Sequence, residues 1–294
     1  MKKTIISTIV ASLLLSTSVI ANSKIKSVTE VNHAAIAKGT QDALASQKKL
    51  VQEAISSLQF TSDALVALNK KDAKAATANI EKALGKLEVI LSAKNSPKLL
   101  PIDSQVSIVE FVGTKDDVKK SVDTVKDLLE HNKVQTARAL LNSLQSEIDV
   151  SVVSLPLVTY PDALKLAAKY IHENKLEKAK NILQIALNTF DTTTTVIPLP
   201  LLKATDLINT SALLSKNGKK EDALKYLAAA EDELDVAEAL GYVSHSSNTY
   251  KSLHKAIKNV RKEIKGKNKA EKLFDELKKE LKDFKNKIFS EKSK

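Results

Sequence analysis

Apolar residues along most of the chain recur every three or four positions, which is the spacing of one face of an α-helix. Between Val31 and Leu58 the recurring positions are Leu44, Leu50, Val51, Ala54, Ile55 and Leu58. A strand of that length would be implausible, so the pattern predicts a helix over 31–58.

Four later segments share one pattern: a short helix, a polar turn containing Asn, and a second helix with an alanine near its start. The segments read LNKKDAKAATANIEKAL, EHNKVQTARALLNSL, HENKLEKAKNILQIAL and SKNGKKEDALKYLAAA, with alanines at Ala75, Ala137, Ala179 and Ala223. A small residue at this point lets two antiparallel helices approach closely. The alanines are 62, 42 and 44 residues apart, too irregular for a regular solenoid. We therefore expect a bundle of helical hairpins in one globular domain.

The six prolines interrupt the helical pattern in three pairs, each between two hairpins. The pairs are Pro97 with Pro101, Pro156 with Pro161, and Pro198 with Pro200. Near them lie the β-favouring runs QVSIVEFV, DVSVVS and TTTTVI. Proline ends a helix and biases the preceding residue toward extended backbone. These segments are thus extended connectors, or the first two runs pair into one small two-stranded sheet.

Helix ends carry recognisable signals. Thr114 and Asp117 resemble a capping box that opens a helix running to about His131. Pro161 and Pro200 suit the first turn of a helix. Glycines at the expected ends of three helices are Gly218, Gly241 and Gly266.

The last predicted helix, over 269–289, has apolar residues at alternating steps of four and three. They are Ala270, Phe274, Leu277, Leu281, Phe284 and Ile288, and the last five form a candidate oligomer seam. This amphipathic helix can instead dock on the main domain, or its lysines can bring it into weak contact with an anionic membrane surface.

The N-terminus resembles a secretory signal. Lys2 and Lys3 precede an uncharged run over 4–20, and Val19 and Ala21 supply the small residues before a cleavage site. We expect cleavage after Ala21 and a periplasmic mature chain, the alternative being an uncleaved membrane anchor. Because the chain has no cysteine, disulfides, thiol catalysis and thiolate metal sites are excluded.

The net charge of +11 comes from the two ends of the chain. From Lys251 onward 16 Lys and Arg face 7 Asp and Glu, whereas 4–250 contains 28 residues of each sign. With export expected as well, nucleic acid is not a predicted partner.

No motif of known chemistry occurs. The five histidines form no zinc-peptidase pair, and HENKL at His172 lacks the second histidine of that motif. Nucleophile elbows and phosphate loops are missing, and the acids of AEDELDVAEAL have the spacing of a solvated helix face. We therefore predict no catalytic, cofactor-binding or metal-binding residue, and no enzyme.

Several stretches, in order, resemble the YfdX family of exported bacterial proteins. They are ALVALNKKDAKAATANIEKALGKLEVIL, LLPIDSQVSI, LPLVTYPDALKLA, PLPLLKATDLI and AEALGY. The resemblance implies a mainly helical, self-associating periplasmic protein linked to envelope stress such as acid or heat, and acting like a chaperone. It supplies no catalytic residues. The basic heptad tail departs from short members of the family.

Together these observations predict a signal peptide over 1–21, a flexible segment over 22–30, a helical YfdX-like domain over 31–265 and a basic amphipathic helix over 266–294. The expected function is holding of stressed or unfolded envelope proteins by a homo-oligomer; the alternatives are a scaffold for one specific envelope partner and a small-molecule-binding protein. The candidate interaction surface comprises Leu155, Leu157, Tyr160, Leu199, Leu201 and Tyr242, where the proline connectors are expected to converge. Acid is expected to loosen contacts by protonating carboxylates and histidines.

Overall fold

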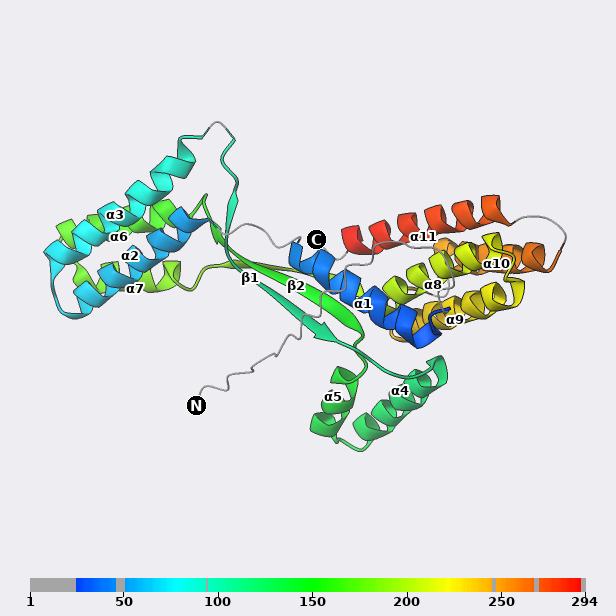
Figure 1. Ribbon diagram of the computed structural model, residues 1–294. Helices are drawn as coiled ribbons and strands as arrows, with labels where there is room; N and C mark the ends of the chain where they lie inside the picture. Colours follow the sequence, from blue (N-terminus) through cyan, green and yellow to red (C-terminus); the bar gives the residue numbers. More distant parts are fainter. Residues whose placement is uncertain (1–24, 46–50, 94, 245–246, 267–269, 292–294) are drawn as a thin grey trace.

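The structure is a computed structural model that describes residues 25–45, 51–93, 95–244, 247–266 and 270–291. The expected signal peptide lies outside these residues. The described chain is mainly helical, with one small antiparallel sheet, as the sequence predicts. Helices gather in two bundles joined by the strands, and a smaller hairpin projects beside the second bundle (Figure 1).

The first bundle consists of two hairpins packed together. Its helices are α2 (Gln52–Asn69), α3 (Ala73–Leu91), α6 (Tyr160–His172) and α7 (Leu176–Ala186). The fully buried Ile80, Leu87, Leu164 and Leu183 belong to its core. Because the sheet inserts Leu100 and Leu155 into the same core, the strands are anchored in this bundle.

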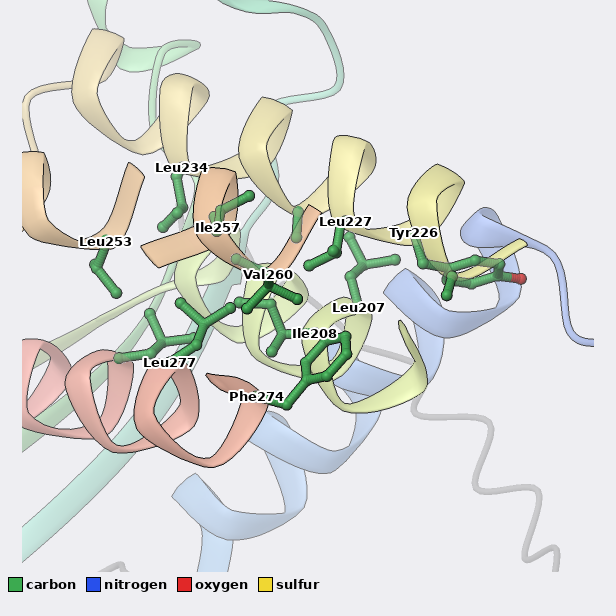
Figure 2. Packing of buried hydrophobic residues seen from close by; sticks show 14 of the residues in the cluster. Leu207, Ile208, Tyr226, Leu227, Leu234, Leu253, Ile257, Val260, Phe274 and Leu277 are labelled. Atoms are coloured by element: carbon green, nitrogen blue, oxygen red, sulfur yellow. The ribbon is translucent and has the colours of Figure 1, made fainter. Parts of the chain in front are cut away.

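The second bundle contains the N-terminal helix and the C-terminal third of the chain. Its helices are α1 (Val28–Ala45), α8 (Leu199–Lys216), α9 (Lys220–Ala239), α10 (Asn248–Lys265) and α11 (Glu271–Glu291). Phe274 and Leu277 of α11 point into the core formed by α8, α9 and α10 (Figure 2). The C-terminal helix is therefore docked, which is one of the three arrangements that its heptad pattern allows.

The remaining hairpin comprises α4 (Lys115–Glu130) and α5 (Val134–Asn142). Helix α4 opens with the predicted capping box, since Thr114 Oγ1 accepts from the Asp117 N–H at 3.3 Å and Asp117 Oδ2 accepts from the Thr114 N–H at 2.9 Å. The two prolines and three glycines at expected helix ends occupy the predicted positions: Pro161, Pro200, Gly218, Gly241 and Gly266.

The sheet contains β1 (Leu99–Val109), β2 (Glu147–Pro156) and β3 (Asp191–Pro198) in the order β1-β2-β3. The predicted pairing of the first two runs is confirmed, with Val106 opposite Val150. The third run, expected to be a connector or an unpaired run, also joins the sheet, with Thr194 opposite Ser151. β-branched residues favour this extended, half-exposed position.

All four predicted hairpins share one turn geometry. The turn residues Lys71, Asn132, Asn174 and Gly218 have φ of 60°, 57°, 56° and 75°, and the next backbone N–H reaches back five residues in each case. This is the Schellman ending of a helix. The buried alanine follows the turn residue by five positions, so the anchor of the first hairpin is Ala76, fully buried, and the prediction of Ala75 is wrong by one residue.

Two boundaries near the N-terminus also differ from the sequence predictions. The single helix expected over 31–58 is two helices, α1 and α2, which belong to different bundles. Val51 is extended, and its N–H donates to the Pro101 carbonyl at 2.9 Å instead of continuing a helix. Of the segment over 22–30 that is expected to be flexible, residues 28–30 belong to α1, and Ile25 and Val28 pack against the second core.

Candidate functional site

The residues of the predicted interaction surface lie mostly in cores. Leu155, Leu157, Tyr160, Leu199 and Leu201 are at most 4% exposed, and only Tyr242 is half-buried. They also belong to three separate clusters of buried residues. The folded chain therefore presents no surface made of these side chains, and the prediction that three proline seams converge is wrong.

Two of the three seams do meet. In the antiparallel sheet the start of β1 lies beside the end of β2, with Leu99 opposite Pro156, whereas Pro198 at the end of β3 lies opposite Glu147 at the start of β2. The first two proline pairs therefore lie at one end of the sheet and the third pair at the other. Antiparallel pairing imposes this arrangement on strands that follow one another along the chain.

A cleft of about 270 Å³, which we call the seam cleft, opens where the first two seams meet. Its lining comprises Leu91, Ser96, Pro97, Lys98, Leu157, Val158, Pro161, Asp162 and Lys165. Around it, the side chain of Val158 is 65% exposed and that of Leu91 is 37% exposed. Asp162 and Lys165 pair at 3.8 Å on the rim. The cleft thus combines an apolar, proline-lined wall with charges at its edge.

Local backbone contacts hold the seam cleft open. The Leu157 N–H donates to the Lys98 carbonyl at 2.8 Å, which fixes the second seam against the first. Pro161 lies in the first turn of α6, where its missing N–H is not needed. The hydrogen bond of Leu157 thus fixes the backbone directly before the exposed Val158.

The third seam is a fixed joint. The Leu199 N–H donates to the Ser146 carbonyl at 2.8 Å, and the Ser146 N–H donates to the Tyr242 hydroxyl at 2.8 Å. Burial raises the pKa of Tyr242 above its usual range. Tyr242, predicted as a surface residue, therefore accepts a hydrogen bond from the backbone directly before β2.

The candidate oligomer seam on α11 is occupied within the chain. Phe274, Leu277 and Leu281 are at most 2% exposed in the second core. Their spacing of three and four fits the facing helices of the same chain, so these side chains are not available to a partner. Phe284 and Ile288 lie outside the residues whose side chains the structure describes.

A charged cleft of about 460 Å³ lies where α4, α9 and α10 meet. Lys115 Nζ lies 3.1 Å from Glu238 Oε2 and 3.6 Å from Asp235 Oδ2. The ring of His254 lies 3.4 Å from Glu231 through Nδ1 and 3.4 Å from Asp235 through Nε2. The acids interpreted as a solvated face thus contact Lys115 of α4 and His254 of α10.

A second charge cluster, centred on a buried lysine, joins four parts of the chain. Lys203 of α8 is 7% exposed, and its Nζ lies 2.9 Å from Glu110 Oε1 and 3.8 Å from Glu233 Oε1. Asn32 of α1 donates from Nδ2 to Glu233 Oε1 at 3.1 Å. We call Lys203, Glu110, Glu233 and Asn32 the Lys203 cluster.

Burial raises the pKa of Glu233 to about 7, although the Lys203 charge opposes this rise; the Glu110 charge adds to it. The pKa of Asp232 is also raised, by burial and then by the charges of Asp235 and Glu231. A raised carboxyl pKa means that acid relieves an unfavourable buried charge. At these two positions acid favours the folded chain, which is opposite to the expected loosening.

Sequence reasoning missed the Lys203 cluster because its members come from four distant segments. One local signal was present: Lys203 is four residues from both Leu199 and Leu207, which are fully buried. A lysine on the apolar face of a helix must find a partner, because an unpaired buried charge is strongly unfavourable.

Two features are absent from the part of the chain that the structure describes. No group of three or more His, Asp or Glu side chains in this part of the chain is arranged to hold a metal ion. Within the same residues, no helix combines the length and the apolar character needed to cross a membrane.

Comparison with known proteins gives a family model that matches part of the chain. Residues 57–196, just under half of the chain, match the family model described as YfdX protein. A crystal structure of Salmonella Typhi YfdX aligns with 12% identity over 51% of this chain and 93% of that chain, at a TM-score of 0.35. No curated protein matches the chain. The resemblance to the YfdX family that the sequence predicts is therefore confirmed over residues 57–196.

Proposed function

We propose that this protein is an exported, non-enzymatic stress protein of the periplasm that holds partly unfolded envelope proteins at its seam cleft. The observation that carries the proposal is the exposure of apolar side chains around that cleft. Val158 and Leu91 line it, and Leu99, next to Lys98 of the rim, is 37% exposed. Exposed apolar residues gathered at one concave place are typical of sites that bind other proteins.

The chemistry of the cleft suits an extended apolar segment. Prolines and aliphatic side chains offer contacts without directional requirements, which is what a holding protein needs in order to accept different clients. The charged rim, formed by Lys98, Asp162 and Lys165, keeps the free protein soluble. Export is supported by Lys2, Lys3, the uncharged run and Ala21.

The test is suppression of aggregation of two unrelated clients, with light scattering as the readout. We expect the wild-type protein to suppress both near a one-to-one ratio, and Val158→Ser or Leu91→Ser to need about three times more protein. A threefold change corresponds to about 0.7 kcal/mol of binding free energy, which is a fraction of the burial energy of one aliphatic side chain. The matched control is Leu213→Ser, because this leucine is 64% exposed and belongs to α8 of the second bundle, whereas the cleft is lined by residues of α3 and α6 in the first.

Three outcomes would contradict the proposal. The first is no suppression of either client, and the second is an equal effect of the cleft variants and Leu213→Ser. The third is capture of one partner alone in a pull-down, which would indicate the scaffold alternative.

A further inference from the structure

The outer edge of β3 has no strand partner among the residues that the structure describes. Within the described residues, β3 pairs only with β2, and the register between them runs without a bulge from Asp191 to Pro198. The five residues 191–195 are all exposed, although α11 also approaches this strand. A straight edge of this kind exposes backbone N–H and C=O groups that favour pairing with another strand.

The opposite edge of the sheet is protected in three ways. β1 contains Pro101, and its register shifts between Pro101 and Asp103. The Val51 N–H caps the Pro101 carbonyl at 2.9 Å. Proline, irregular register and an added contact are all features that keep an edge from pairing. β3 has neither a proline nor a register shift between Thr192 and Ile197, although α11 approaches it, so the two edges differ in proline content and regularity.

We propose that β3 pairs antiparallel with β3 of a second copy of this chain, so that the two three-stranded sheets become one. The sequence of the edge, DTTTTVIP, favours its own copy as the partner. It carries no charge from Thr192 to Ile197, so two copies bring no like charges opposite one another. Threonine pairs across neighbouring strands are also favourable.

The register follows from the alternation of side chains. Residues directly opposite in an antiparallel pair lie on the same face, so a twofold axis perpendicular to the sheet must place one residue opposite itself. With Thr194 at the axis, Asp191 lies opposite Ile197 and the pairing includes every residue of β3 except Pro198, which has no N–H to donate. An axis at Thr193 shortens the overlap, and an axis at Thr195 brings Pro198 into it.

Side chains of the sheet support the same axis. Ser151 Oγ and Thr194 Oγ1 are hydrogen-bonded at 2.9 Å, and Ser151 lies opposite Gln105 of β1. Placing Thr194 of two copies side by side continues this polar row across the joint. The row then runs over both sheets on one face without interruption.

The test uses the absence of cysteine from the chain. Single substitutions Thr193→Cys, Thr194→Cys and Thr195→Cys are oxidised mildly and examined on a non-reducing gel. In the proposed register the two Thr194 Cα atoms are roughly 5 Å apart, whereas two residues at 193 are roughly 8 Å apart, beyond the reach of a disulfide. We expect Thr194→Cys to form dimer at least ten times faster than either neighbour.

The control is Thr124→Cys on α4, an exposed threonine far from the sheet edge in sequence. A second measurement is the dimer dissociation constant of Thr194→Lys, by sedimentation, which we expect to rise at least tenfold because two lysines then meet at the axis. Equal cross-linking of Thr194→Cys and Thr124→Cys would overturn the proposal, as would a monomeric wild-type protein. Maximal cross-linking at 193 or 195 would overturn the register.

Discussion

The pH dependence of stability tests the buried carboxyl of Glu233 most directly. Its side chain is 16% exposed, Asn32 donates to it at 3.1 Å, and Lys203 lies 3.8 Å away. Burial raises its pKa from 4.5 to about 7. We consider the substitution Glu233→Gln, which keeps the shape and an acceptor for Asn32 but cannot ionise.

The magnitude follows from linkage between protonation and folding. Because the pKa is higher in the folded chain, the folded state binds more protons than the unfolded state between pH 4.5 and about 7. Stability therefore falls as pH rises through this window. The penalty is absent below pH 4.5, complete above pH 7, and amounts to roughly 3 kcal/mol.

The measurement is the free energy of unfolding by urea, followed by circular dichroism, at several values of pH from 4.5 to 8. At pH 8 we expect Glu233→Gln to be more stable than the wild type, by at most roughly 3 kcal/mol, because Lys203 keeps Glu110 as a partner at 2.9 Å. At pH 4.5 the two proteins should be nearly equal. The control Glu88→Gln removes an exposed carboxyl on α3 and should show no such pH-dependent difference.

Two results would refute this reasoning. A difference between wild type and Glu233→Gln that stays constant with pH would show that Glu233 does not titrate in this window. If the unfolding free energy favours the variant more at pH 5 than at pH 8, the pKa of Glu233 is lowered in the folded wild-type chain, not raised.

Two further predictions concern packing. Ala76→Leu should lower the free energy of unfolding by about 1–3 kcal/mol, because Ala76 is fully buried where α3 meets α2, whereas Ala75→Leu, partly buried, should cost less than about 1 kcal/mol. Urea denaturation shows which variant loses more unfolding free energy. A larger loss for Ala75→Leu than for Ala76→Leu would indicate that Ala75 is the anchor. Leu277→Ala should cost about 2–5 kcal/mol and speed amide exchange in α10 and α11, because the side chain fills the second core. A changed oligomer size with unchanged exchange would instead return α11 to the role of an oligomer seam.

The hairpins were predictable because their signals are local. A polar turn followed by a buried alanine can be seen in any window of about fifteen residues, and the four turns share one backbone geometry. Counting from the asparagine of each turn places the first alanine at Ala75. The first hairpin has Lys71 at the position with positive φ, and counting from that residue gives Ala76.

The sheet and the charged sites depend on contacts between distant segments. The β-branched runs predict the pairing of β1 with β2. The pairing of β3 depends on the second edge of β2 remaining open to it, and no local sequence pattern indicates this. The heptad pattern of α11 also leaves its partner open, because its apolar side chains fit any apolar surface, within the chain or on another molecule. The Lys203 cluster needs four segments, so only the single misplaced lysine could have indicated it.

The order of strands and helices also separates the two sites in space. The chain leaves the first bundle along β1, forms the α4–α5 hairpin, returns along β2 and leaves again along β3 to the second bundle. The seam cleft therefore lies at one end of β2, and Glu110, which follows β1, lies toward the other. Ten residues of extended strand span roughly 30 Å. The buried charge that makes stability pH-dependent is thus too far from the seam cleft for direct contact with a bound segment, so any coupling between acid and holding has to be transmitted through the sheet.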